Sequence, residues 1–454
     1  MRDLLLLVFV LGGCGVALFR PFTGMLLFAF LGFFNPQSFT WGFGQTFPFS
    51  QLAAGSTILG YIASPERKAL PLQREVLILL GLWIMFGIST FFAIFPNESV
   101  PKLILISKIF LMVLLATALV NTEERLHAFL RVISFSLGFY AVKGSAFVIA
   151  SGGSQIVYGP ENSFLNANNM IGLALAMNIP ILLYLLKRET RLWLRWTIRA
   201  MVFFSYPAVI FTYSRGAWLG LAMVTALLVL KTKYKLIIVP AAGLLAVVLV
   251  TAAPLIAPGR LIQRYDSLVN YEQEKSAESR FWNWEFCRRV GVARPLYGGG
   301  FSFYATELYP IYYPEFVAYW GPDQMWSCHS MWLTVLAEHG FPGLALWLGL
   351  MISSFISLRG VRRYAQVYPE LSWMNECVIA LQGAFIAFMV VGTFIDSAYF
   401  DMFYYLVVIV VTMKERLRQF VAVRLASAAA VVTPAFAGMG TMGRKGYVRD
   451  LRHS

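Results

Sequence analysis

A series of apolar runs divides this chain and leaves it few ways to fold in water. Hydrophobic residues fill 58% of the 454 positions and charged residues only 13%, whereas soluble domains carry about 25% charged residues. The runs lie near residues 4–19, 22–35, 51–64, 75–95, 103–120, 126–150, 168–187, 199–213, 215–231, 235–257, 331–357, 376–397 and 402–413. Several are shorter than the roughly 20 residues that a bilayer requires, so not all need to span it. We therefore expect an all-α polytopic membrane protein with about twelve transmembrane helices.

The basic residues give the expected orientation. Their excess is clearest in four loops, at residues 187–199, 231–235, 359–363 and 414–418. Short basic loops remain in the cytoplasm. Alternation from them places Arg215, the loop 151–167 and the polar stretch 258–328 on the outer side, with the C-terminus inside. Because the net charge of +14 lies mostly in such loops, we expect no nucleic-acid partner.

This pattern predicts four regions. They are an N-terminal transmembrane bundle (1–257), a helical loop domain on the outer side (258–328), the C-terminal transmembrane helices (329–418) and a partly disordered cytoplasmic tail (419–454).

The polar stretch 258–328 combines arginines with many aromatic residues. It holds a single lysine, Lys275, against Arg260, Arg264, Arg280, Arg288, Arg289 and Arg294. A guanidinium group binds phosphate or carboxylate oxygens in pairs, and aromatic faces can stack on sugars or cover lipid. We interpret the segment 258–343, which begins with this stretch, as the candidate active site.

Residues 276–291 predict a capped helix within that stretch. Arg280, Trp284 and Arg288 recur every four residues, so they share one helix face. An amphipathic helix lying on the membrane, with its arginines at headgroup phosphates, is the alternative. The glycines at 298–300 are compatible with an anion-binding loop or with a simple turn.

Two further residues are candidates by position. Arg215 lies at the outer end of an apolar run, against the positive-inside bias, although such an arginine could simply extend to the interface. We interpret Arg215 as functional. His329 precedes a long apolar run, so we expect it in the first turn or cap of a helix, where the helix dipole favours the neutral, proton-accepting ring. A hydrogen-bonded interface histidine is the alternative. Glu338 falls on the opposite helix face and is expected to be structural.

The cysteines, histidines and acidic residues predict no metal site and no cofactor. The four cysteines form no CxxC pair, the four histidines do not cluster with them, and the outer stretch contains no DxD pair. Cys287 and Cys328 both fall in the polar stretch. They could form a disulfide in an oxidising compartment, or remain as isolated thiols.

Several motifs together carry a resemblance to a known family. They are Arg215-x-x-x-Leu219, His329-Ser330 followed by nine residues and Gly340-x-x-Gly343, the segment from Ser279-Arg280 to Gly298-Gly299-Gly300, and Asn166-Ala167-Asn168-Asn169. In this order the chain resembles the superfamily of O-antigen ligases and O-antigen polymerases, and the ligases most closely. The opening, from Met1-Arg2-Asp3 through Phe34-Asn35-Pro36 to Thr40-Trp41-Gly42-Phe43, is similar to exosortase-associated O-glycosylation ligases.

The resemblance implies a fold similar to lipid-dependent (GT-C-like) glycosyltransferases and a multi-pass protein of the bacterial inner membrane. It implies transfer of a glycan from undecaprenyl diphosphate to a sugar hydroxyl of lipid A-core on the periplasmic side, which completes lipopolysaccharide. His329 would deprotonate the acceptor. Arg215 and Arg280 first, and Arg288 second, would bind the diphosphate in a metal-independent, inverting reaction.

Alternatives remain open from the sequence. A polymerase or a protein O-glycosylation ligase would use the same donor with another acceptor. A transporter or flippase for lipid-linked oligosaccharide would bind the diphosphate without chemistry, and it would need polar residues through the bilayer centre on several helices. Here Lys108, Arg131 and Lys143 are few and scattered.

Overall fold

A computed structural model describes residues 1–64, 70–230 and 275–436. The expected span 235–257, the basic loop 231–235, the start of the outer stretch (258–274) and the end of the tail (437–454) lie outside these residues. In the described part, every regular element is an α- or 3-10 helix. The prediction of an all-helical chain is therefore confirmed for this part.

The described α-helices follow the apolar runs. In the first half they are α1 (Arg2–Phe19), α2 (Pro21–Phe33), α3 (Phe49–Ala63), α4 (Arg74–Phe91), α5 (Pro96–Leu119), α6 (Glu123–Ala150), α7 (Asn168–Arg188), α8 (Leu192–Ile210) and α9 (Arg215–Leu230). In the second half they are α12 (Lys275–Ala293), α13 (Tyr309–Tyr312), α14 (Pro314–Trp320), α15 (Met331–Ala365), α16 (Ser372–Gly392) and α17 (Asp401–Phe436).

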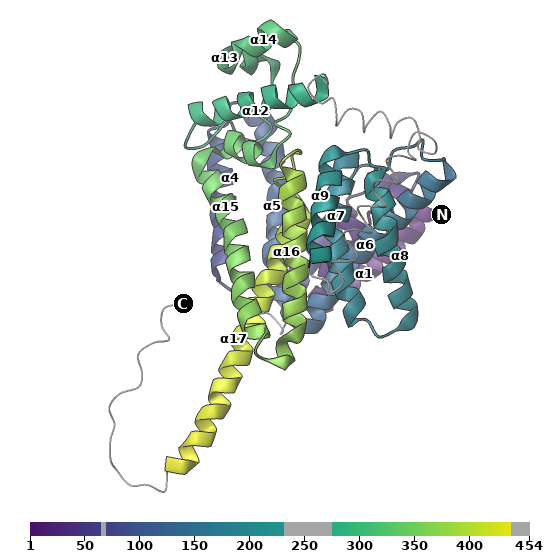
Figure 1. Ribbon diagram of the computed structural model, residues 1–454, viewed down its shortest axis with the longest axis vertical. Coiled ribbons are helices and arrows are strands. Elements are labelled where there is room, and N and C mark those ends of the chain that lie inside the picture. The colour runs from purple at the N-terminus through teal and green to yellow at the C-terminus, as the bar shows by residue number, and fades with distance from the viewer. Residues whose placement is uncertain (65–69, 231–274, 437–454) are drawn as a thin grey trace.

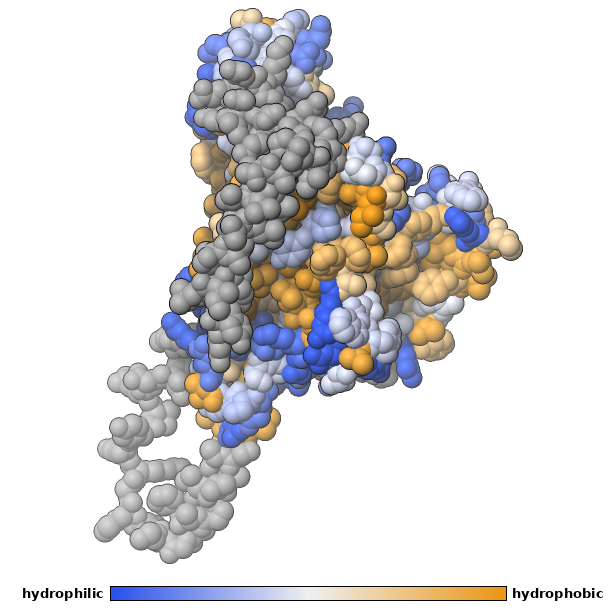
Figure 2. Space-filling model, turned by 45° about the vertical axis from the view of Figure 1, so that its right-hand side comes forward, coloured by the Kyte–Doolittle hydropathy of each residue, from blue (hydrophilic) through white to orange (hydrophobic). Residues whose placement is uncertain are grey.

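Seven helices of the described part are long and apolar enough to cross a membrane: α1, α4, α5, α6, α7, α15 and a segment that contains α16, Pro369–Gly392. The helices α2 and α9 are apolar but shorter. The expected count of about twelve spans stays a prediction. In Figure 2 apolar side chains form a broad band between two more hydrophilic ends, as a bilayer-embedded bundle requires.

The first turns of α17 form the centre of the bundle. From Met402 to Val411 every residue is almost completely buried, and a helix that is apolar on all sides belongs in a core. Phe403 stacks on Phe388 of α16 with ring centroids 4.7 Å apart. The helices α5, α15 and α16 all pack against α17. The bundle is thus built around residues 402–411, in the first turns of α17.

The polar helices α12, α13 and α14, which belong to the stretch expected on the outer side and are called the outer elements below, lie across one end of this bundle. Figure 1 shows α12 crossing the ends of α4, α15 and α16, with α13 and α14 on its far side. The connection between α7 and α8, which belongs to the expected basic loop 187–199, lies at the opposite end, as does the C-terminal end of α15. The expected loops 359–363 and 414–418 are helical instead, because the first continues α15 and the second continues α17. Within the described residues, the structure therefore separates the arginines of α12 from the basic segments 187–199 and 359–363, as the orientation argument expects.

A break in α15 joins the outer elements to the bundle. Gly340 leaves helical geometry with φ +65°, and Phe341 N donates to the carbonyl of Pro295. A Cβ on Gly340 would lie 2.5 Å from that carbonyl oxygen, and a Cβ on Gly298 would lie 2.4 Å from the carbonyl carbon of Glu338. Only glycine fits at either place. The expectation of one helix over 331–357 is wrong at Gly340, because two segments meet there.

The glycine run 298–300 packs against that break. Gly299 N donates to Ala337 O at 2.7 Å, and Gly300 N donates to Glu338 O at 3.0 Å. These amides supply partners to helix carbonyls that the break leaves without intrahelical donors. The run is therefore a structural turn, the second of the two alternatives that the sequence allowed.

Candidate active site

His329 lies in the connection between the outer elements and α15. It precedes Ser330, the N-cap residue of α15, and its φ is +47°. The expectation of a first-turn or cap position is therefore wrong by one residue. A left-handed conformation costs a residue with a side chain about 1–2 kcal/mol, and such positions persist where the surroundings hold them.

Asp396, in the connection after α16, lies against His329. Its Oδ2 atom is 3.5 Å from His329 Nδ1. The hydroxyl of Ser327 lies 3.4 Å from the same nitrogen and donates to Asp396 Oδ2. The hydroxyl of Thr334 donates to Asp396 Oδ1 at 2.7 Å. Both oxygens of the carboxylate are thus held in place beside the ring.

This geometry sets the protonation state of His329. A proton on Nδ1 faces the carboxylate, which leaves Nε2 as the proton acceptor. Burial lowers the pKa of His329, the carboxylate of Asp396 partly offsets this, and the positive charge of Arg280 lowers the pKa further. The ring is therefore neutral at neutral pH.

Arg280 lies close enough to His329 for its charge to act on the imidazole. It belongs to the N-terminal part of α12. One turn further along, the Trp284 ring lies 6.2 Å from the ring of Phe394, which is only two residues before Asp396. The helix face predicted for Arg280 and Trp284 thus turns toward the end of α16.

Arg215 opens α9 beside the same phenylalanine. A Cβ placed on the next residue, Gly216, would lie 3.3 Å from Cβ of Phe394, so the first turn of α9 packs directly against it. Tyr213, which has φ +53°, anchors the preceding turn by donating its hydroxyl to Gly153 O at 2.7 Å. The connection after α16 therefore brings the surroundings of Arg215, Arg280 and His329 together.

Arg288 makes its contacts elsewhere on α12. Its Nε and one terminal nitrogen each lie 2.8 Å from the carboxylate of Glu285. Glu285 also accepts from Arg289. The Arg288 guanidinium, followed by that of Arg289, holds the pKa of Glu285 at about 2. The described contacts of Arg288, a predicted site residue, thus lie with Glu285.

Glu338 and His339, the two residues before the break in α15, form a second polar group, which is buried. Glu338 accepts from Ser302 N at 3.0 Å and from the hydroxyl of Tyr399. His339 uses both ring nitrogens, at 2.9 Å from Ser89 Oγ and 2.6 Å from Tyr399 Oη. Both side chains are almost completely buried. This supports the structural role expected for Glu338.

A disulfide ties α12 to the connection that holds His329. Cys287 and Cys328 are joined, with their Cα atoms 5.9 Å apart. The sequence left this pairing open. Because His329 directly follows Cys328, the bridge fixes the backbone at the proposed base to the helix that carries Arg280.

Sequence reasoning missed Asp396, Ser327 and Thr334. A signal for Asp396 was present, because it is an acidic residue near the outer end of the expected run 376–397. An ionisable residue in such a run is a candidate functional residue. Its partner could not be named, since nothing in the sequence pairs this position with His329.

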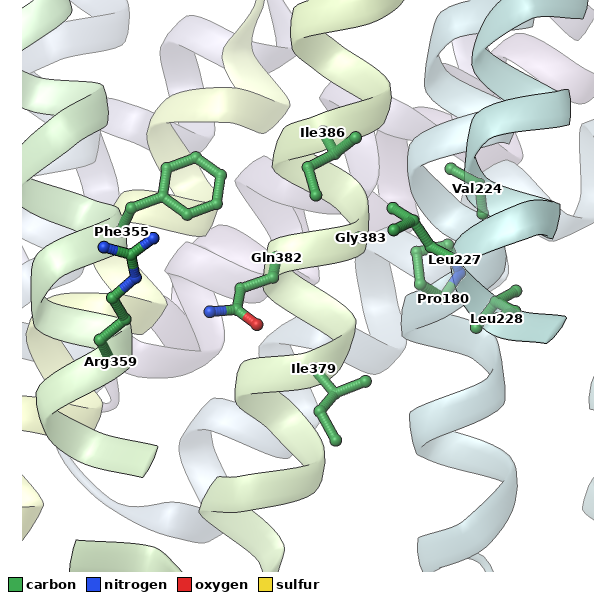
Figure 3. Close-up of a pocket in the computed structure, with 10 residues that line it drawn as sticks. All are labelled: Pro180, Val224, Leu227, Leu228, Phe355, Arg359, Ile379, Gln382, Gly383 and Ile386. Atoms are coloured by element: carbon green, nitrogen blue, oxygen red, sulfur yellow. The ribbon is translucent and has the colours of Figure 1, made fainter. Parts of the chain in front are cut away.

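A cavity of about 220 Å³ lies elsewhere in the bundle, between α7, α9, α15 and α16. Figure 3 shows Arg359 and Gln382 beside it and apolar side chains around the rest. Leu228 and Arg359 lie near the ends of their helices that point away from α12, so this cavity is separate from His329. Within residues 1–64, 70–230 and 275–436, no group of three or more His, Cys, Asp or Glu side chains is placed to hold a metal ion.

Comparison with known families divides the chain into two matched parts. Residues 1–190 match a family of unknown function (DUF5935). Residues 200–348 match the O-antigen ligase family. A search of curated proteins finds no match. The second match contains Arg215, Arg280, Arg288 and His329, whereas Asp396 lies outside it. The match over residues 200–348 supports the resemblance of the chain to the superfamily of O-antigen ligases and O-antigen polymerases.

Proposed function

We propose that this multi-pass membrane protein is an O-antigen ligase that transfers a glycan from undecaprenyl diphosphate to a sugar hydroxyl of lipid A-core. The match to the O-antigen ligase family supports a glycosyltransferase-like activity with a lipid-linked glycan donor and a membrane-embedded acceptor. The observation that carries the chemistry is the geometry of His329, whose Nδ1 lies 3.5 Å from Oδ2 of Asp396.

His329 acts as the general base in this proposal. Its Nε2 takes the proton of the acceptor hydroxyl while the oxygen attacks C1 of the donor sugar. The new C1–O bond forms as the bond from C1 to the diphosphate oxygen breaks, and its electron pair leaves with the diphosphate. Direct attack inverts the anomeric centre. Base catalysis of this kind contributes roughly 10²–10⁴-fold, and Asp396 stabilises the imidazolium that forms.

The arginines balance the charge that grows on the leaving diphosphate. No nucleotide triphosphate is available outside the cytoplasm, so the energy for the new bond must arrive with the donor. Arg215 and Arg280 bind the diphosphate first, and Arg288 follows in a second position. Planar guanidinium groups can do this without a metal ion, because each presents a rigid pair of donors to phosphate oxygens.

The proposal places the reaction on the periplasmic side of the inner membrane. Two observations support this orientation. The disulfide Cys287–Cys328 suits an oxidising compartment, and the basic segment 187–199 and the basic last turn of α15 lie at the end of the bundle opposite α12.

Reconstitution with defined substrates tests the function. Purified protein in liposomes receives lipid-linked O-antigen and lipid A-core, and the product is examined by mass spectrometry. A ligase yields lipid A-core that carries the glycan. A longer lipid-linked glycan would identify a polymerase. In a parallel reaction that receives periplasmic proteins in place of lipid A-core, a glycosylated protein would identify a protein O-glycosylation ligase. Movement of intact donor across the bilayer without new bonds would identify a flippase. Each of these three results would reject the ligase.

A further inference from the structure

The outer helices carry a column of stacked side chains that ends at an exposed tyrosine. Trp282 of α12 lies parallel to Tyr319 of α14, with ring centroids 5.1 Å apart and planes at 12°. The same indole stacks on Tyr313 at 5.3 Å. The guanidinium carbon of Arg289 lies 4.1 Å from the centroid of Tyr313. We call these four side chains the ring column.

Carboxylates lie at both ends of the ring column. Arg289 pairs with Glu285 at 2.8 Å and with Glu315 at 3.0 Å. At the other end, the carboxylate of Glu278 raises the pKa of the Tyr319 hydroxyl, so the two groups lie close together. A ring stacked in this way loses little conformational freedom when a ligand binds to it.

Tyr319 is nevertheless open to solvent. It is 60% exposed, although Trp282 stacks on it. Aromatic residues at the surface of a membrane protein usually lie in belts at the bilayer interface. Tyr319 does not, because α14 lies on the far side of α12 from the spans (Figure 1). Membrane anchoring therefore does not account for this exposed ring.

The ring column lies near the proposed active site but on another face of α12. Trp282 follows Arg280 by two residues, which is about 3 Å along the axis and about 200° around it. Arg280 acts on His329, so the column faces away from the reacting atoms. A ligand at Tyr319 would therefore be a part of the substrate that extends around the N-terminal end of α12.

We propose that Tyr319 binds a sugar ring of the glycan, at some distance from the sugar that reacts. This rests on the proposed function, which supplies a glycan chain long enough to reach from His329 to the outer face of α12. Sugar rings present C–H groups that pack on aromatic faces. The carboxylate of Glu278 accepts hydrogen bonds only, and it retains capacity for sugar hydroxyls. Since Glu285 and Glu315 balance Arg289, an uncharged polyhydroxyl ligand suits the column.

The test uses two lipid-free probes and three variants of the full-length protein in detergent. One probe is the glycan released by mild acid from the undecaprenyl diphosphate-linked donor of the bacterium that encodes the chain, which represents the donor glycan. The other is the core oligosaccharide from lipopolysaccharide of the same bacterium that lacks O-antigen, which represents the acceptor. Tyr319→Ala removes the ring, and Tyr319→Phe keeps the ring but removes the hydroxyl. Ile311→Ala is the matched control, because Ile311 is 69% exposed on α13 and is not part of the column.

Isothermal titration measures binding of each probe. We expect Tyr319→Ala to weaken binding of one probe about 2- to 10-fold, the range for a ring-on-ring contact. Tyr319→Phe and Ile311→Ala should stay within about twofold of wild type. The affected probe identifies donor or acceptor, and KM for that substrate should rise in Tyr319→Ala while kcat is kept.

Several results would overturn the proposal. These are absence of binding of both probes to the wild type, unchanged binding in Tyr319→Ala, or equal weakening in Ile311→Ala. Loss of self-association in Tyr319→Ala, with sugar binding unchanged, would reassign the ring to a protein contact. Transfer is measured in parallel. Probe binding that depends on Tyr319 without any transfer would reject the ligase and keep the sugar site. Transfer by the wild type, together with probe binding that is unchanged in Tyr319→Ala, would keep the ligase and reject the sugar site.

Discussion

Oδ2 of Asp396 lies 3.5 Å from Nδ1 of His329, although one residue precedes α15 and the other follows α16. The contact joins the two ends of a helix pair that runs through the bundle and returns. It fixes which ring nitrogen is available to a substrate, and it gives the site a carboxylate that can stabilise a positive imidazolium.

Replacement of His329 by Ala should abolish transfer and leave donor binding intact. The variant removes a proton acceptor whose side chain is 38% exposed, rather than a fully buried packing group. Transfer is followed with lipid-linked O-antigen and lipid A-core, and donor binding is followed by native mass spectrometry. Near-normal transfer would reject His329 as the base.

Replacement of Asp396 by Asn should reduce kcat by roughly 10²-fold and shift its pH dependence. In the wild type the pKa of His329 is below its ordinary value, so activity should persist at pH 6.5 and fall only as the pH drops through the lowered pKa. Because Asp396 raises the pKa of His329, its removal should move the acid limb to still lower pH. The measurement is kcat/KM against pH. An unchanged acid limb would show that the carboxylate does not act on the ring.

Arg215→Lys and Arg280→Lys should each weaken transfer strongly although the charge is kept. An ammonium group cannot reproduce the paired hydrogen bonds of a guanidinium group. Arg288→Lys provides the comparison and should cost less, because Glu285 already binds that guanidinium at 2.8 Å. Initial rates in proteoliposomes measure the effect. Full activity in the first two variants would point to interfacial anchoring instead.

Transfer should continue in excess EDTA. In the proposed mechanism Arg215 and Arg280 take the place of a divalent ion at the diphosphate. The assay needs detergent-purified protein and defined substrates, because chelation in cells disrupts the outer membrane. Loss of activity that Mg²⁺ or Mn²⁺ specifically restores would contradict the arginine site. The acidic residues between Asp266 and Asp323 would then be the first to mutate.

The double variant Cys287→Ser/Cys328→Ser should lower the free energy of unfolding by about 2–5 kcal/mol. The bridge closes a loop of 41 residues, so its loss frees the unfolded chain. It also releases the backbone before His329, and transfer should fall with stability. Thermal unfolding in detergent measures the change. Cys14→Ser is the control, since Cys14 is a free cysteine, and equal melting of both variants would exclude a stabilising bridge.

The sequence alone predicted the features that depend on residues close together in the chain. Apolar runs predicted spans such as α4 and α7, and the four-residue spacing of Arg280 and Trp284 predicted the face of α12 that turns toward α16. The run 235–257 lies outside the described residues, so the count of about twelve spans is still a prediction.

Contacts between distant segments could not be predicted in the same way. The pairing of Asp396 with His329 depends on how α15 and α16 pack, and no periodicity encodes that packing. The break at Gly340 likewise depends on the carbonyl of Pro295 occupying the space of a side chain. Arg288 shares a face with Arg280 by spacing, yet Glu285, three residues earlier in the chain, binds its guanidinium group.

The interlocked glycines Gly298 and Gly340 have a consequence for protein engineering. Each leaves room for the backbone of the segment that carries the other, so the two segments must have complementary shapes. Exchange of the outer elements between two relatives would therefore give misfolded chimaeras if a junction fell between Pro295 and Gly340. A transplant that includes both glycines carries the matched pair intact, and it should move substrate preference without disturbing insertion.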